Sequence, residues 1–220
     1  MDLMYKIALA LHITGGSVGL IIGTIVILLS KADKRHQRLG KVFNYGMLTA
    51  GFSAILLSII HPNLFLMMVA VMTIFSVISG NRYLKLKKLD KGQKPKWVDW
   101  ANIICLTIAA VGFIVVGVQQ VIGENNFGIV YLVFGFGSLN AVRVDFLNFN
   151  GKTQPNKYWL LLHLQRMMGA YIASFTAFIV VNAHHIPLNI PGIVYWLLPT
   201  AIFMPLILFW LRKVEAGQKV

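Results

Sequence analysis

Residues that can carry charge or bind metal stand inside or beside long apolar runs of this 220-residue chain: His36, Asp99, Arg143, Asp145, His163 and Arg166. A buried arginine needs a carboxylate partner, and in this group of residues only Asp99 and Asp145 supply one. These groups could simply pair and hold helices in register. Alternatively, Asp145 and the two histidines could bind a cation, relay protons or hold a cofactor.

A seventh candidate is His12, which precedes a run of glycines that recur every four residues: Gly15, Gly19 and Gly23. Glycines at this spacing let another helix approach closely. Because His12 lies on the same face as this stripe, we expect its ring to point at a neighbouring helix or at a cofactor. A similar stripe follows Arg166 and contains Gly169 and Ala173, which also predicts helix packing.

The histidines suggest haem or metal chemistry. A haem needs two facing histidines, and the sequence offers His12 with His61 or His184 on one side and His36 with His163 on the other. No single helix carries the regularly spaced histidine pair of cytochromes of the b561 type. A divalent metal could use His36, Asp145 and His163, although zinc hydrolases need three histidines on one side.

Other classes of chemistry find little support. The single cysteine, Cys105, lies in an apolar run, so no internal disulfide and no cysteine-based metal site can form. Nucleophile elbows, phosphate-binding loops, dinucleotide fingerprints and H-E-x-x-H are absent from the sequence. The pattern therefore identifies no catalytic residue and does not decide whether the protein is an enzyme.

The elements that must position these residues follow from composition. Hydrophobic residues make up 57% of the chain and charged residues 12%, whereas a soluble domain has about 45–50% and about 25%. Runs long enough to cross a bilayer as helices occur at residues 5–29, 42–61, 64–84, 98–122, 127–147, 158–183 and 191–211. The sequence thus predicts an all-α integral membrane bundle of seven transmembrane helices, forming one domain over residues 1–220.

The distribution of basic residues predicts orientation and location. Lysines and arginines, which give a net charge of +13, concentrate in alternate connections, at residues 30–41, 82–97 and 143–157, and in the C-terminal tail. The positive-inside rule then places the N-terminus outside and the C-terminus in the cytoplasm, in a bacterial cytoplasmic membrane. We expect the basic loops to contact anionic lipid head groups and expect no nucleic-acid binding.

Four strings make the chain resemble a bacterial family of predicted multi-pass membrane proteins of unknown function. They are Leu11-His12-Ile13 with its glycines, Lys31…His36-x-x-x-Gly40-Lys41-Val42-Phe43, His163-x-x-Arg166-Met167-x-Gly169-Ala170-Tyr171, and Trp196-Leu-Leu-Pro199-Thr200. The resemblance implies the same multi-span architecture. It also implies that His12, His36, Asp145, His163 and Arg166 occupy the family's motif positions, but it implies no mechanism.

Three functions remain open. The first, which we favour from the sequence, is a haem or metal protein of membrane redox chemistry, with His12, His36 and His163 as ligands and Asp145 and Arg166 as charge partners. The second is a proton-coupled transport or small-molecule binding protein in which Asp145 and His163 titrate. The third is an accessory subunit of a membrane complex, or a homo-oligomer, that uses the glycine stripes as contact faces.

Overall fold

The computed structural model describes residues 2–29, 33–152, 157–185 and 190–218. Within these residues the chain contains no strand, two short 3-10 turns and seven helices that are long and apolar enough to cross a membrane. The helices are α1 (Asp2–Leu28), α2 (Lys34–Ile60), α3 (Leu64–Tyr83), α4 (Trp97–Ile122), α5 (Gly128–Phe149), α6 (Tyr158–Val181) and α7 (Gly192–Glu215). The predicted all-α bundle of seven membrane helices is confirmed.

The largest difference from the predicted spans is at the start of α2, which begins at Lys34 rather than at residue 42. Asp33 caps this helix, because its side chain accepts a hydrogen bond of 2.8 Å from the Arg35 backbone nitrogen. The basic segment that reads as a loop is therefore two further turns of helix. It brings His36 into a helix that packs on the bundle.

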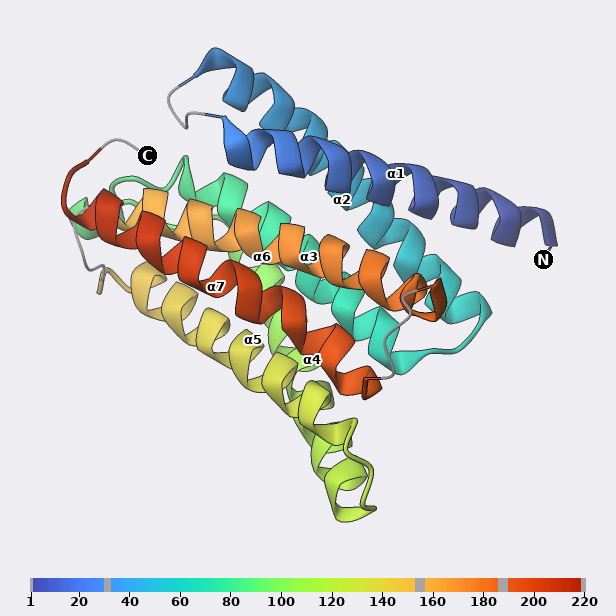
Figure 1. Ribbon diagram of the computed structural model, residues 1–220. Coiled ribbons are helices and arrows are strands. Elements are labelled where there is room, and N and C mark those ends of the chain that lie inside the picture. The colour runs from blue at the N-terminus through green and yellow to red at the C-terminus, as the bar shows by residue number, and fades with distance from the viewer. Residues whose placement is uncertain (1, 30–32, 153–156, 186–189, 219–220) are drawn as a thin grey trace.

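Helices α3 and α6 occupy the middle of the bundle (Figure 1). α3 packs against α2, α4 and α6, and α6 also contacts α1 and α7. The pairs α1–α2 and α4–α5 lie on opposite sides of this centre, at the top and the bottom of the view. Side chains that α3 directs toward its neighbours can therefore meet groups from three helices.

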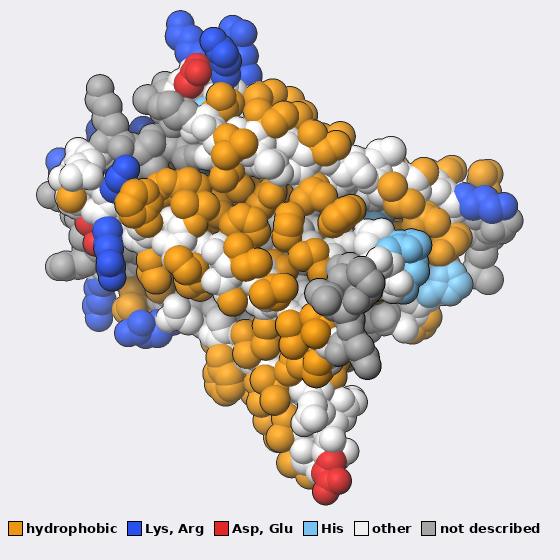
Figure 2. Space-filling model, viewed as in Figure 1, with side chains coloured by type: hydrophobic (Ala, Val, Ile, Leu, Met, Phe, Trp, Pro, Cys, Tyr) orange, Lys and Arg blue, Asp and Glu red, His pale blue; other side chains and the backbone are white. Residues whose placement is uncertain are grey.

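Most lysine and arginine side chains visible in Figure 2 gather at one end of the molecule, where α1 ends, α2 begins and α7 ends. We call this the basic end, and the end that holds the N-terminus of α1 the opposite end. On the face shown in Figure 2, hydrophobic side chains cover most of the surface between the two ends. An apolar belt of this kind is what contact with the hydrocarbon of a bilayer requires.

The glycine stripe of α1 is used inside the chain. A Cβ added to Gly15 would lie 2.7 Å from the Gly46 carbonyl oxygen and 2.9 Å from the Ala50 backbone nitrogen, so the backbones of α1 and α2 touch there. At Gly19 the neighbour is instead the side chain of Met47, which packs where a Cβ would stand. The predicted packing role of this stripe is therefore met by α2.

The far end of the stripe packs on a second helix. A Cβ on Gly23 would lie 2.6 Å from the Tyr171 ring and 3.0 Å from the Phe43 ring. One turn away, the hydroxyl groups of Thr24 and Tyr171 are hydrogen-bonded at 2.9 Å. This contact joins α1 to α6 near the basic end.

Candidate functional site

Asp145 on α5 lies at the centre of the most polar part of the bundle and has 0% exposure. Its carboxylate accepts hydrogen bonds from three side chains. The Arg166 Nη2 atom donates at 2.8 Å, the Tyr83 hydroxyl at 2.8 Å and the Ser79 hydroxyl at 3.0 Å. The predicted ion pair between Asp145 and Arg166 is therefore present, and it joins α5 to α6 and α3.

Arg166 reaches Asp145 because α6 runs close to α3. A Cβ added to Gly80 would lie 3.0 Å from the Arg166 Cβ atom, so the glycine lets the two helices approach. The guanidinium also donates to the Ala141 carbonyl oxygen at 3.0 Å and lies 5.0 Å from the centre of the Phe75 ring. Its Nε atom is buried and has no hydrogen-bond partner among the described residues. The arginine is thus held by one anion, one carbonyl and one ring face.

A second ion pair lies beside the first. The Nε and Nη2 atoms of Arg82 donate to the two carboxylate oxygens of Asp99 at 2.6 and 2.7 Å. Asp99 also accepts a hydrogen bond of 2.7 Å from the Lys96 backbone nitrogen, so its carboxylate caps the start of α4. The sequence offered Asp99 as a partner for the deep arginines. The structure instead pairs it with Arg82, at the end of α3.

The two ion pairs share one small interior site, which we call the charge cluster: Arg82, Asp99, Asp145 and Arg166. Its walls include Ser79, Tyr83 and Asn102. The side chains fill this site and leave no space for a water molecule between them. Two arginines and two aspartates make the cluster formally neutral, which lowers the cost of holding four charges inside a membrane bundle.

The three candidate histidines all direct their Nδ1 atoms at a backbone carbonyl of a neighbouring helix. His163 meets Gly80 O at 2.9 Å, His36 meets Val26 O at 3.3 Å, and His12 meets Ala50 O at 2.9 Å. His36 therefore folds against α1, and it lies close enough to His163 for their charges to interact. The ring of His12 points at a neighbouring helix, one of the two outcomes expected from the glycine stripe.

His12 and His163 lie at different depths of the bundle. Gly23 and Tyr171 are in contact across α1 and α6. From that contact, His12 lies eleven residues toward the opposite end along α1, and His163 lies eight residues toward the basic end along α6. The two rings are therefore separated by about 28 Å of helix rise. They cannot share one haem or one metal ion. His61, for its part, packs edge-on against Tyr5, and His184 lies beside His185 with ring centres 3.8 Å apart.

The metal set expected from the sequence is not assembled. Among the described residues, no three His, Cys, Asp or Glu side chains come close enough to hold a metal ion. Asp145 contacts arginine, tyrosine and serine, while His36 and His163 contact backbone carbonyls, so the three proposed ligands face different partners. Arg143, expected among the deep charges, is exposed and forms no ion pair with any described residue.

Sequence reasoning missed Arg82, Tyr83 and Ser79, which bind the two carboxylates. In the sequence, Arg82 was assigned to a basic loop, and Ser79 and Tyr83 were assigned to an apolar run without a polar role. Charge balance gave no signal, because Arg143 and Arg166 already matched the two acids, and only the structure shows that Arg143 is exposed. Ser79 and Arg82 are, however, spaced three residues apart, on one face of α3.

Comparison with known proteins adds no relative. No family model, no curated protein and no solved structure matches this chain.

The Tyr83 hydroxyl offers a mild test of the charge cluster. Tyr83→Phe removes one hydrogen bond to Asp145 and the weaker one at 3.4 Å from the Asn148 amide, and leaves the ring packing in place. We expect the free energy of unfolding to fall by about 1.5–3 kcal/mol, the range for a hydrogen bond to a charged group. Unfolding by sodium dodecyl sulfate in mixed micelles measures it. Tyr45→Phe, an exposed tyrosine on α2, should change it little.

Proposed function

We propose that the protein handles protons across a bacterial cytoplasmic membrane, as a proton relay or a proton-coupled transporter, and that Asp145 is the titrating group. The observation that carries this proposal is the environment of its carboxylate, which is fully buried between three membrane helices with one cation and two hydroxyl groups. An apolar pair would pack the same helices without the cost of desolvating two charges. Ionisable groups inside a membrane bundle are functional by default.

Groups that can pass protons connect Asp145 toward the basic end. The Tyr83 hydroxyl binds both Asp145 and Asn148. The preceding residue in the chain, Arg82, has 18% of its side chain exposed, so the charge cluster reaches the surface there. A hydroxyl both donates and accepts hydrogen bonds, which is the property that a proton relay needs.

Buried hydroxyl groups also extend from Asp145 toward the opposite end. Ser76 lies one turn from Ser79 on α3, and Ser138 lies two turns from Asp145 on the same face of α5. Thr176 lies further along α6 and is 2% exposed. The hydroxyl oxygens of Ser138 and Thr176 are buried and have no hydrogen-bond partner among the described residues. These unpaired hydroxyls support a polar path on the α3 side of α5 and α6.

Protonation of Asp145 would have a mechanical consequence. Arg166 has Asp145 as its anionic partner, so a neutral Asp145 leaves a buried guanidinium with the Ala141 carbonyl and the face of the Phe75 ring but no anion among the described residues. Such a cation must move or gain another anion, because an uncompensated buried charge is costly. Proton uptake is thereby coupled to movement of α6 against α5, which is the step that a transporter requires.

The other two functions have less support. A metal site has less support because, among the described residues, no three His, Cys, Asp or Glu side chains come close enough to hold a metal ion, and His12 lies too far from His163 to join it in one site. An accessory role based on the α1 glycine stripe loses its contact face, because α2, Phe43 and Tyr171 cover that stripe. The inferred orientation, with the basic end in the cytoplasm, follows the positive-inside rule, and membership of the bacterial family stays a prediction from the four strings.

The test is proton flux in liposomes that contain the purified protein and a pH-sensitive dye, driven by a potassium diffusion potential. We expect flux above that of empty liposomes for the wild type and for Asp145→Glu, which keeps a carboxylate. Asp145→Asn should reduce the flux to the level of empty liposomes. The matched control is Asp90→Asn, since Asp90 is an exposed acid between α3 and α4 and should leave the flux unchanged.

Two results would contradict the proposal. One is a wild-type protein that conducts no protons above empty liposomes, and the other is unchanged flux in Asp145→Asn. Because Asp145→Asn leaves Arg166 unpaired, the double variant Asp145→Asn, Arg166→Gln is measured beside it, and elution as a single species confirms folding. This pair keeps loss of flux separate from loss of structure.

A further inference from the structure

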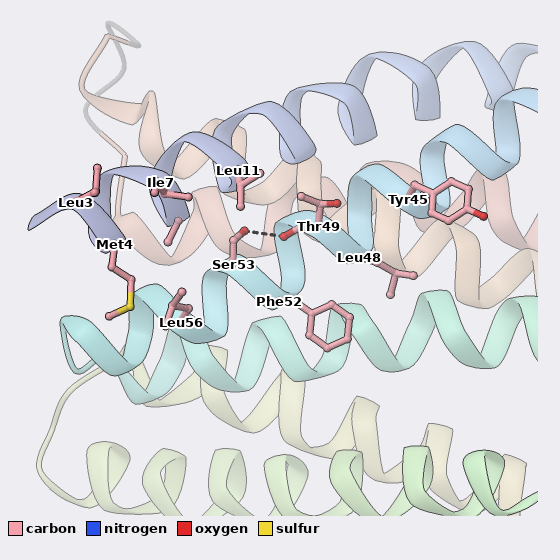
Figure 3. A pocket seen from close by; sticks show the side chains of 11 residues that line it. Leu3, Met4, Ile7, Leu11, Tyr45, Leu48, Thr49, Phe52, Ser53 and Leu56 are labelled. Carbon is pink, nitrogen blue, oxygen red and sulfur yellow. Dashed lines mark hydrogen bonds between the residues drawn. The ribbon is translucent and has the colours of Figure 1, made fainter. Parts of the chain in front are cut away.

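A groove lies between the first half of α1 and the second half of α2, far from the charge cluster (Figure 3). It has a volume of about 790 Å³. Leu3, Met4, Ile7 and Leu11 line it from α1, and α2 supplies further aliphatic and aromatic side chains between Tyr45 and Leu56. Several of these side chains, among them Leu3, Leu11 and Phe52, are about half exposed or more, so the groove opens on the lipid-facing surface.

The wall of the groove is mostly hydrocarbon, with hydroxyl groups from Tyr45, Thr49 and Ser53. Ser53 lines it, but its hydroxyl donates to the carbonyl oxygens of Thr49 at 2.6 Å and Ala50 at 3.1 Å on its own helix (Figure 3). The hydroxyl proton is therefore used within α2. A polar solute would leave its own groups unpaired in such a groove, whereas an alkyl chain would lose nothing.

The length of the groove distinguishes between a lipid chain and a helix. From Leu56 to Tyr45 there are eleven residues, or about 16 Å of helix rise. One leaflet contributes about 15 Å of the ~30 Å hydrocarbon core. On α1 the lining stops at Leu11, so the groove does not continue through the second leaflet. A transmembrane helix of a partner needs a contact surface through both leaflets, but one acyl chain fills a single leaflet.

We infer that this groove holds one acyl chain of a phospholipid from the leaflet at the opposite end, with the phosphate beside Lys6. Lys6 is exposed and stands between Met4 and Ile7, two residues that line the groove. It is the one lysine or arginine that the described residues place at this end of the bundle. A cation beside a hydrocarbon groove matches the two parts of a phospholipid. This inference does not depend on the proposed proton function.

The experiment is native mass spectrometry of the whole protein after incubation with vesicles of phosphatidylcholine and phosphatidylglycerol in a ratio of about 3:1, a composition that supplies anionic lipid. We expect one phospholipid per chain to stay bound at a collision energy that strips the others. Thr49→Phe puts a ring into the groove and should lower the retained fraction by about tenfold. Leu11→Phe, which fills the groove from α1, should act in the same direction if Thr49→Phe fails to fold.

Matched controls separate groove binding from general lipid contact. Thr14→Phe introduces the same ring on the exposed surface of α1 at a residue that does not line the groove, and should retain the lipid as the wild type does. Lys6→Gln should reduce the preference for phosphatidylglycerol over phosphatidylcholine. Equal retention in Thr49→Phe and Thr14→Phe, no retained lipid in the wild type, or a dimer that excludes lipid would each overturn the inference.

Discussion

Replacement of Arg166 by alanine is expected to lower the free energy of unfolding by about 3–5 kcal/mol, the typical cost of removing one partner of a buried ion pair. Asp145 has 0% exposure and would keep only the hydroxyl groups of Ser79 and Tyr83 as donors. Two neutral hydrogen bonds do not offset the desolvation of a carboxylate in this position. Unfolding in mixed micelles with increasing sodium dodecyl sulfate measures the loss.

A double-mutant cycle isolates the pair from the packing of the arginine stem. In an Asp145→Asn background, Arg166→Ala should cost at least about 1.5 kcal/mol less than in the wild type, because no anion is then left unpaired. An equal cost in both backgrounds would show that Arg166 acts through packing alone. Arg143→Ala is the matched control. It removes an exposed arginine two residues from Asp145 and should stay within about 0.5 kcal/mol of the wild type.

Gly15→Ala is expected to be the most disruptive single-methyl addition in the first two helices. The new Cβ would lie 2.7 Å from the Gly46 carbonyl oxygen and 2.9 Å from the Ala50 backbone nitrogen. Both contacts are with backbone, which cannot rotate away as a side chain can, so α1 must shift off α2. We expect a loss of about 2–3 kcal/mol, toward the upper part of the range for overpacking, measured as above.

Gly16→Ala supplies the comparison, because a Cβ at Gly16 meets nothing within 4 Å. Alanine forms helix better than glycine, so this neighbour should gain up to about 1 kcal/mol. The hydrogen bond between His12 and Ala50 lies beside the same crossing, and its loss in Gly15→Ala would show by the chemical shifts of the ring. If the two glycine variants have the same stability, the close approach of α1 and α2 is wrong.

Sequence was sufficient for the number and approximate bounds of the membrane helices, because a span of lipid hydrocarbon imposes a length and an apolar composition on each. The sequence did not predict the parts of helices that extend beyond the hydrocarbon. The segment from Lys34 to Lys41 is as helical as the apolar part of α2, but its charged residues led to the prediction of a loop. Its N-terminal limit depends on the single hydrogen bond to Asp33, which hydropathy does not register.

Prediction of the polar site succeeded for Asp145 and Arg166 because both lie well inside apolar runs and need a partner there. It failed for Asp99, whose partner depends on which helices are neighbours. Arg82 ends the helix next to α4, so it is nearer to Asp99 than any arginine of α5 or α6. For the histidines, helix packing shows what composition cannot: the Nδ1 atoms of His12 and His163 each meet a backbone carbonyl of a neighbouring helix. Such a contact orients the ring and leaves Nε2 available, so the role of these histidines as ligands stays a prediction.

The position of α3 has a consequence for biosynthesis. Ser79 and Tyr83 leave the ribosome long before their partner Asp145, and Asp145 leaves it before Arg166. Helices α1 and α2 can pair as soon as both are inserted, because Gly15 and Gly46 bring their backbones together. The carboxylate of Asp145 instead gains its partner Arg166 only after α6 has been inserted into the membrane. Assembly therefore has two stages, an early α1–α2 hairpin and a later core whose buried ion pair is complete only once α6 supplies Arg166.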